Sequence, residues 1–506
     1  MTTPKHREDA RCQPRWASAA MVAALVAVAV AGVHAVAWGA GGGHGGGTHV
    51  DTFAAVLLEL AAVIVTAMIG RWAAAAVNQP SVLGELLVGV AAGNLGYWLG
   101  QPLFILVMHL GDTQPLFAEI WATGLPVRDV APRVFSAAQL APGGIGEQVV
   151  QILTGPGSSH LVVMTIALWM FSNLGVILLL FMVGLESTVN EMLAVGPRAV
   201  AVAVIGIIAP FGLGYLATRL VLPELPVTVA LFTGATLSAT SVGITARVFK
   251  DLNRLQAPEA RIILGAAVID DVLGLIILAI VVGIVASGGV EIGAIVRIGL
   301  LAAMFLGVVI IFGERMVRGL IPVMTALDRR NLKLLFPLAL ALALSWLASK
   351  IELATIVGAF AAGLILNEKH FPKADDEHAT TIEELIHPLE AIFAPVFFVL
   401  MGMQVNLATF GSIDTLGISL ALIITAIVAK LVAGLPAGKG VDRLSVGIGM
   451  VPRGEVGLIF ASVGKSLGVV DEGLFSAVVI MVIVTTLLAP LLLKWSLARN
   501  TRRAAA

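Results

Sequence analysis

In Gly265-Ala266-Ala267-Val268-Ile269-Asp270-Asp271-Val272-Leu273-Gly274, two adjacent carboxylates stand near the middle of an apolar stretch that runs from about residue 262 to residue 286. Such a stretch is long enough to cross a bilayer, which takes roughly 20 residues of helix. A charged carboxylate at that depth costs about 3 kcal/mol or more. The two side chains lie about 100° apart on a helix, so both can border one polar cavity.

Two explanations for this acidic pair are open. Mutual repulsion and poor solvation favour protonation of at least one carboxylate, and an acid that holds either a proton or a small cation is the minimum apparatus for exchanging the two. Alternatively, a neighbouring Arg or Lys neutralises the pair, which then serves packing alone. An acid inside a membrane is by default a functional candidate, and the first explanation is therefore preferred.

The composition indicates an all-α polytopic membrane protein. Of 506 residues, 58% are hydrophobic and 12% are charged, whereas ordinary globular chains carry about 25% charged residues. The single cysteine, Cys12, excludes an intrachain disulfide and a cysteine-based metal site. The sequence contains no P-loop, dinucleotide fingerprint or basic nucleic-acid patch. We therefore expect no ATP-driven pump, no enzyme, no cofactor and no nucleic-acid partner.

The N-terminal region has two interpretations. Residues 1–37 combine a basic start, an alanine-rich apolar run and the ending Ala35-Val36-Ala37, which is typical of a signal peptide. The alternative is an uncleaved extra N-terminal helix. Residues 38–52 form a Gly/His-rich spacer, in which a metal-binding role for His44 and His49 is also open.

Apolar periodicity beyond the spacer predicts about thirteen membrane spans: 53–73, 81–98, 161–185, 199–221, 227–249, 259–285, 292–317, 333–349, 353–367, 386–407, 413–435, 441–464 and 473–495. If residue 51 lies outside, the basic tail 496–506 is cytoplasmic. Most Lys and Arg residues then lie inside, and the outer loops carry only Arg128, Arg133, Lys350 and Lys465. The positive-inside rule thus predicts a multi-pass protein of a bacterial-type inner membrane with a cytoplasmic C-terminus.

Short motifs repeat between the two halves of the chain. Residues 84–89 (GELLVG) resemble 358–363 (GAFAAG), and residues 181–186 (FMVGLE) resemble 399–404 (VLMGMQ). Because the matching spans start on opposite sides, these matches predict inverted repeats, unless the similarity is due to chance. Secondary transporters use such repeats, with a substrate site near the midplane. The predicted units are a first repeat 51–285, a linker helix 286–332 and a second repeat 333–495, with 99–157 as a periplasmic insertion of short helices.

Two spans show signs of interruption. Span 227–249 concentrates hydroxyls and glycines in residues 233–243 (TGATLSATSVG), which fits either a closely packed helix or a discontinuous one whose freed carbonyls help to coordinate a cation. Span 441–464 contains Pro452 among several glycines, and this predicts a break. Arg453 and Glu455 follow Pro452, and they either offset the dipoles of the half-helices or pair with each other.

Lys430 lies near the predicted inner end of span 413–435. It either extends to the membrane interface or serves as the cationic partner of the aspartates. Three other charges in or near spans, Glu59, Glu85 and Arg297, are assigned to helix ends or domain interfaces.

Taken together, these residues resemble monovalent cation:proton antiporters of the NapA/NhaA type. The resemblance covers roughly 51–98 and 161–495 and rests on the following motifs: 79–86 (QPSVLGEL), 179–186 (LLFMVGLE), Asp270-Asp271, 358–360 (GAF) and 451–457 (VPRGEVG). It implies an NhaA-like fold, in which a core domain with crossed broken helices moves elevator-like against a dimerisation domain. It also implies a homodimer.

The resemblance further implies roles for single residues. Asp271 matches the family's principal carboxylate for Na⁺, and Asp270 matches the acid that pairs with a membrane lysine. Lys430 matches that lysine. Thr240 and Ser241 match the unwound stretch beside the ion.

We therefore expect an electrogenic Na⁺(Li⁺)/H⁺ antiporter that exports sodium in exchange for protons, with monovalent cations, protons and the lipid bilayer as its partners. The Asp-Asp pair with a lysine resembles members that exchange two protons for one sodium. Potassium-efflux relatives typically have Gln-Asp and a cytoplasmic nucleotide-binding domain, and this sequence shows neither. Two alternatives stay open: a K⁺/H⁺ antiporter, and a non-transporting ion sensor or channel-like subunit. An organic-anion symporter fits less well, because the aspartates would repel a carboxylate substrate.

Overall fold

The computed structural model describes residues 52–77, 79–137, 139–185, 189–287, 292–351, 353–371, 380–408 and 413–505. Within these ranges the chain forms helices and connecting turns and contains no strand. The predicted signal peptide and the spacer with His44 and His49 lie outside the described residues, except for Thr52.

Ten helical stretches in the described ranges are long and apolar enough to cross a membrane, which confirms the multi-pass helical class. Three predicted spans are not among them. Helix α3 (Ser81–Trp98) carries Glu85 and Asn94, α15 (Thr355–Ile365) has only 11 residues, and the span at 441–464 is interrupted. The count of thirteen spans therefore stays a prediction.

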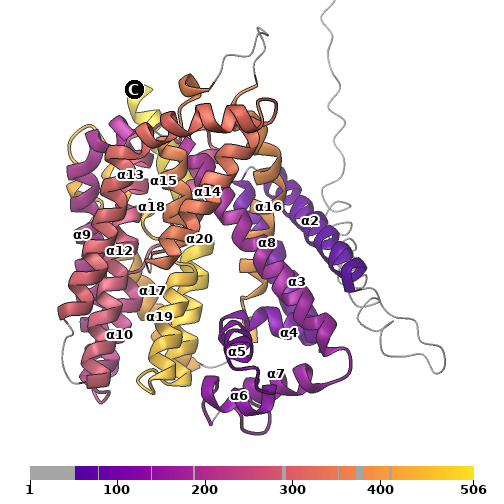
Figure 1. The fold of residues 1–506 in the computed structure, drawn as a ribbon. Helices are drawn as coiled ribbons and strands as arrows, with labels where there is room; N and C mark the ends of the chain where they lie inside the picture. The colour runs from indigo at the N-terminus through magenta and orange to yellow at the C-terminus, as the bar shows by residue number, and fades with distance from the viewer. Residues whose placement is uncertain are drawn as a thin grey trace, which may run out of the picture.

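The long helices pack in two groups, which lie side by side in Figure 1. The first group contains α2 (Thr52–Ala76), α3, α8 (Ser158–Leu185), α14 (Leu332–Lys350), α15 and α16 (Ile382–Met403). In this group α16 packs on α8 and α3, α15 packs on α8 and α14, and α2 packs on α3. Helix α16 starts at a capping box, in which Thr381 and Glu384 each accept a hydrogen bond from the other's main-chain N–H.

Glycines allow the helices of the first group to approach closely. A Cβ on Gly402 of α16 would lie 2.3 Å from the carbonyl oxygen of Leu86 in α3, and one on Gly89 of α3 would lie 2.3 Å from that of Val399 in α16. Helices α8 and α15 meet in the same manner. There a Cβ on Gly184 would lie 2.3 Å from the carbonyl oxygen of Phe360, and one on Gly363 would lie 2.3 Å from that of Phe181. Any side chain at these four positions would force the helices apart.

The second group contains the elements that carry the acidic pair and both interrupted spans. It comprises α9 (Val189–Val221), α10 (Val227–Ser238), α11 (Val242–Asp251), α12 (Pro258–Ser287), α17 (Ile413–Ala433), α18 (Arg443–Gly449), α19 (Glu455–Ser466) and α20 (Glu472–Ala505). Helix α9 packs on α10, α12 and α17, and α20 packs on α17, α18 and α19. Helix α13 (Ile292–Leu327) contacts both α12 and α15, so it touches both groups.

Four short helices occupy the segment 99–157: α4 (Pro102–Met108), α5 (Leu110–Thr123), α6 (Val127–Val134) and α7 (Ile145–Thr154). They share a small apolar core that includes Leu116, Val130 and Val149. Figure 1 shows α5, α6 and α7 at the end of the molecule opposite the C-terminal end of α20. Helix α5 also contacts α19, so this segment reaches from the first group to the second.

Candidate functional site

The two interrupted helices cross at their breaks. Helix α10 ends at Ser238 and α11 begins at Val242, and the residues between them are not helical. Helix α18 ends at Gly449 and α19 begins at Glu455, with Pro452 between them. This confirms the predicted break at Pro452, and for span 227–249 it decides in favour of the discontinuous helix over the closely packed one.

Two hydrogen bonds hold the crossing together. The main-chain N–H of Ser241 donates to the carbonyl oxygen of Pro452 at 2.9 Å. The side-chain hydroxyl of Thr245 donates to the carbonyl oxygen of Gly449 at 2.6 Å. A Cβ at Gly454 would lie 2.8 Å from Oγ of Ser241. Glycine at 454 therefore permits the two non-helical segments to approach this closely.

Helix α12 passes the crossing and carries the acidic pair. Asp270 is buried, with 2% of its surface exposed, while Asp271 is partly exposed. Consecutive residues on a helix point in directions about 100° apart, and this explains the difference in exposure.

Lys430 of α17 reaches the first break from the neighbouring helix. Its ammonium donates to the carbonyl oxygens of Gly206 and Ser238, at 2.5 and 2.8 Å, and to Oγ1 of Thr240 at 2.7 Å. An ammonium has three donors, and three oxygens accept them here, so the geometry fits the charged form. The side chain is fully buried, which contradicts the alternative that it extends to the membrane interface.

Lys430 and Asp270 form a loose ion pair, with 3.7 Å between Nζ and Oδ1. The shorter contact to Ser238 joins the ammonium to the last residue of α10. Cations are favourable at a helix C-terminus, because the carbonyl groups there carry partial negative charge. Lys430 thus offsets both the aspartate and the end of the half-helix.

Arg453 places a second positive charge at the crossing. It is fully buried, and it lies within electrostatic range of Asp270 and Lys430. Its carbonyl oxygen accepts a hydrogen bond from the hydroxyl of Thr486, while its guanidinium nitrogens hydrogen-bond to none of the described residues. Glu455 is the first residue of α19. The predicted alternative of an Arg453–Glu455 salt bridge depends on the Glu455 side chain, which lies outside the described part of the structure.

The structure thus brings together Asp270, Lys430, Thr240, Ser241 and Arg453, with Asp271 next to them on α12. Carboxylates, hydroxyls and freed main-chain carbonyls are hard oxygen ligands for small cations, and Lys430 and the aspartates can exchange protons. The site therefore combines the parts needed to bind a cation and a proton at one place inside a membrane protein.

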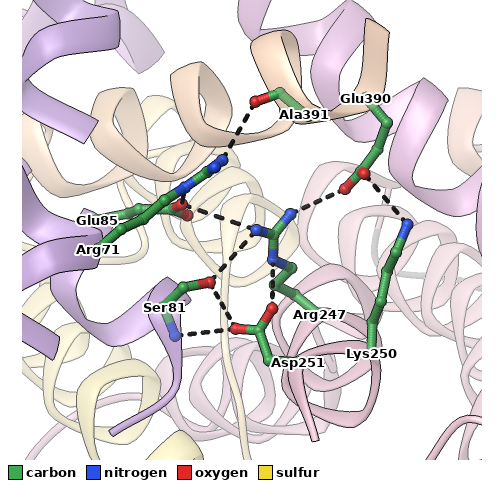
Figure 2. Close-up of polar contacts among 8 residues, drawn as sticks. All are labelled: Arg71, Ser81, Glu85, Arg247, Lys250, Asp251, Glu390 and Ala391. Carbon is green, nitrogen blue, oxygen red and sulfur yellow. Dashed lines mark hydrogen bonds and ion pairs between the residues drawn. The ribbon is translucent and has the colours of Figure 1, made fainter. Parts of the chain in front are cut away.

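Sequence reasoning missed two features near this site. The carbonyl of Gly206 was not anticipated, because main-chain acceptors leave no signal in the sequence. The second feature is a buried group of charges around Arg247 (Figure 2), of which only Glu85 was assigned, to a helix end or a domain interface. Glu85 does contact another helix, because its carboxylate accepts a hydrogen bond from Arg71 of α2 at 2.6 Å.

The other two charges singled out in the sequence lie away from the crossing. Glu59 lies within α2 and its side chain is buried, and neither of its carboxylate oxygens hydrogen-bonds to a described residue. Arg297 is exposed on α13. Neither contributes to the site.

The chain is similar to known transport proteins. The chain is 36% identical over 448 residues to the high-affinity Na(+)/H(+) antiporter NhaS3 of Synechocystis, covering 86% of this chain and 88% of that protein. It is 33% identical over 361 residues to the Na(+)/H(+)-K(+) antiporter GerN of Bacillus cereus, covering 70% of this chain and 90% of that protein. It is 31% identical over 363 residues to an Na(+)/H(+) antiporter of Enterococcus hirae, covering 70% of this chain and 91% of that protein.

The fold is similar to that of the sodium proton antiporter MjNhaP1 of Methanocaldococcus jannaschii at pH 8, with a TM-score of 0.50 and 15% sequence identity. The likeness covers 87% of this chain and 99% of that one. The family model described as sodium/hydrogen exchanger, transmembrane, matches residues 131–499. The prediction of a monovalent cation:proton antiporter family is confirmed, while the NapA/NhaA-type subclass stays a prediction. On the family match and the relatives together, the chain belongs to the sodium/hydrogen exchanger family.

Proposed function

We propose that this protein is an electrogenic Na⁺(Li⁺)/H⁺ antiporter that exports sodium in exchange for protons by alternating access. The observation that carries the proposal is the position of Lys430. Its ammonium lies 3.7 Å from the Asp270 carboxylate and donates a hydrogen bond to the carbonyl oxygen of Ser238, the last residue of α10. Three relatives that are 31% to 36% identical are named as antiporters of Na⁺ and H⁺, which supports the choice of ions.

In the proposed cycle, Asp271 binds Na⁺ or a proton alternately on the two sides of the membrane. Thr240 and Ser241 lie at the break of α10 and α11 and supply further oxygen ligands. A cation beside the acidic pair repels the Lys430 ammonium, because two positive charges a few ångströms apart in a poorly solvated site interact strongly. The Asp270–Lys430 pair then breaks, and Lys430 releases the second proton.

The stoichiometry follows from this cycle. Two protons enter, one on Asp271 and one on Lys430, for each Na⁺ that leaves. Each turnover then moves one net positive charge inward, so the membrane potential drives export together with the proton gradient. Arg453 and Glu455 offset the charges of the half-helix ends throughout the cycle.

We propose an NhaA-like architecture of about thirteen spans, with inverted repeats at 51–285 and 333–495 and a linker helix at 286–332. Reciprocal glycine contacts support the repeats. Gly89 of α3 meets Gly402 of α16, and the positions that the repeat motif matches to them, Gly363 of α15 and Gly184 of α8, meet in turn. The second helix group is the moving core of a homodimer in the inner membrane, with a cytoplasmic C-terminus.

The test is the cation dependence of ΔpH dissipation in proteoliposomes, with and without a clamped membrane potential. We expect Na⁺ and Li⁺ to dissipate the gradient, and we expect the rate to depend on the potential. Potassium and rubidium belong in the same screen, because the name of the GerN relative includes K⁺. Exchange with K⁺ but not Na⁺ would establish the K⁺/H⁺ alternative, and no cation dependence at all would favour a sensor.

A further inference from the structure

Seven residues form an ionic cluster apart from the acidic pair: Arg71, Ser81, Glu85, Arg247, Lys250, Asp251 and Glu390 (Figure 2). Glu85, Arg247 and Glu390 are buried, and the other four are half-buried. Three of them belong to α11, which continues from the first break. The other four belong to α2, α3 and α16 of the first helix group. Helix α11 also contacts α8 of that group, so the cluster lies where the two groups meet.

Glu390 makes ion pairs across this boundary. Its two carboxylate oxygens lie 2.8 Å from Nη1 of Arg247 and 3.2 Å from Nζ of Lys250. Glu390 is 2% exposed, so its carboxylate is almost fully removed from water. Both of its cationic partners belong to α11, on the other side of the boundary.

Three further residue pairs cross the boundary: Asp251 with Ser81, Arg247 with Ser81, and Arg247 with Glu85. The carboxylate of Asp251 accepts hydrogen bonds from the main-chain N–H and the hydroxyl of Ser81, at 2.9 and 2.6 Å. Nη2 of Arg247 donates to the hydroxyl oxygen of Ser81 at 3.3 Å. Nη2 of Arg247 lies 3.8 Å from Oε1 of Glu85. The C-terminal half of α11 is thus fastened to α3 and α16.

Other contacts stay within one side. Nε of Arg247 lies 3.0 Å from Oδ1 of Asp251 on the same helix, and Nε of Arg71 lies 2.6 Å from Oε1 of Glu85 within the first group. Separation of the two sides would therefore leave each with an ion pair of its own, and Glu390 and Lys250 would be the charges that lose their partners. Leaving a buried charge without a partner is the main penalty when such contacts break. The cost of opening the cluster therefore falls mainly on Glu390 and Lys250, and the ion pairs kept on each side limit it to those two charges.

Helix α11 connects this cluster to the crossing. Arg247 lies six residues after Ser241, a distance of about 9 Å along the helix axis. The N-terminal half of α11 is bonded to α18 through Thr245, and its C-terminal half is bonded to the first group. Any movement of the crossing relative to the first group must strain or break the cluster.

We propose that the ionic cluster is a latch between the two helix groups, which holds them in the arrangement seen here and must open in every transport cycle. The proposal rests on the proposed function for the claim that the groups move. Arg247 and Glu390 are positioning residues in it, because they act on the ion site through α11.

A reversible cross-link tests the latch. Substitution of the only cysteine, Cys12→Ser, gives a cysteine-free parent, and Ser81→Cys with Asp251→Cys then places two thiols across the boundary. A short bis-methanethiosulfonate reagent should reduce Na⁺-dependent exchange at least tenfold, and reduction should restore it. The control is Lys333→Cys with Glu368→Cys, whose native side chains form a 3.2 Å ion pair outside the boundary; the same treatment should leave exchange unchanged. Full activity of the cross-linked Ser81/Asp251 variant would overturn the proposal.

A second measurement requires no transport. In the parent with Ser81→Cys, the added change Glu390→Gln should increase the labelling rate of the thiol by a maleimide severalfold, because the latch opens more often. The added change Lys333→Gln should not alter labelling. Equal labelling with and without Glu390→Gln would contradict the latch. A parent that exchanges no monovalent cation would refute the proposed function instead, and the labelling comparison would still decide on the latch.

Discussion

The ammonium of Lys430 donates a hydrogen bond at 2.8 Å to the carbonyl oxygen of Ser238, the last residue of α10. The same ammonium lies 3.7 Å from the Asp270 carboxylate. One proton-carrying group therefore holds both the broken end of a helix and one acid of the pair. We therefore expect loss of its charge to alter the helix end and the ion site together, and thereby to couple protonation to the geometry of the site.

Replacement of Lys430 by Gln should abolish the charge movement of exchange while the fold persists. Glutamine keeps two amide donors for the oxygens around it but carries no exchangeable proton. The expected result is electroneutral exchange of one proton for one Na⁺, so the transport current in proteoliposomes disappears while ΔpH dissipation continues. Lys333→Gln, which removes a cation from the start of α14, is the matched control. A current of wild-type size in Lys430→Gln would refute the role of Lys430.

Asp271→Asn should abolish cation-dependent exchange, because the amide is close in shape but can neither ionise nor release a proton. The measurement is Na⁺-dependent dequenching of a ΔpH dye in everted vesicles, normalised to the amount of protein in the membrane. Asp112→Asn, which removes a partly exposed acid from α5, should retain exchange. Dequenching by the Asp271 variant at more than about a tenth of the wild-type rate would exclude Asp271 as the principal ligand.

The sequence predicted structure best where the chemistry of single residues allows only one local conformation. Pro452 lacks a main-chain donor, so the break after α18 could be predicted from that residue and its glycines alone. Adjacent acids in an apolar stretch identified α12 for a similar reason. The depth of Lys430 was ambiguous, because a lysine near a helix end can either extend to the interface or turn inward, and only the packing of α9 and α10 decides.

Contacts between distant segments were the least predictable. Arg247 and Glu390 are 143 residues apart and each lies in a region where charges are expected on the inner side, so their pairing left no local signal. The acceptors of Lys430 are mainly carbonyls, which every residue possesses. The ends of helices were also hard to predict. The range 496–506 was expected to be a tail separate from the last span, but α20 continues through most of it.

The close approach of the two breaks makes a steric prediction at Gly454. A Cβ there would lie 2.8 Å from Oγ of Ser241 and 3.0 Å from its Cβ, so Gly454→Ala should push the non-helical segments apart and lower exchange at least tenfold. Its φ of −140° lies outside the left-handed region that favours glycine, and the effect is therefore expected from the contact with Ser241.

Gly457→Ala is the control for this change, because a Cβ at that position would lie at an ordinary distance of 3.6 Å from Val482. Both variants are compared by initial rates of Na⁺-dependent exchange at equal protein levels. Similar rates for the two variants would show that the crossing tolerates expansion.

The glycine contacts of the first group lead to a prediction about stability. In Gly402→Ala the new Cβ would lie 2.3 Å from the carbonyl oxygen of Leu86, so α16 and α3 must move apart. Overpacking of this kind typically costs about 1–3 kcal/mol of the free energy of unfolding. Gly307→Ala on α13 is the matched control, because a Cβ there has no neighbour within 4 Å and alanine favours a helix by roughly 0.5–1 kcal/mol over glycine. In thermal unfolding of the purified protein in detergent, the melting temperature of Gly402→Ala should fall by several degrees, while that of Gly307→Ala should stay constant or rise. If the melting temperatures of the two variants changed equally, the close approach of α3 and α16 would not be a source of stability.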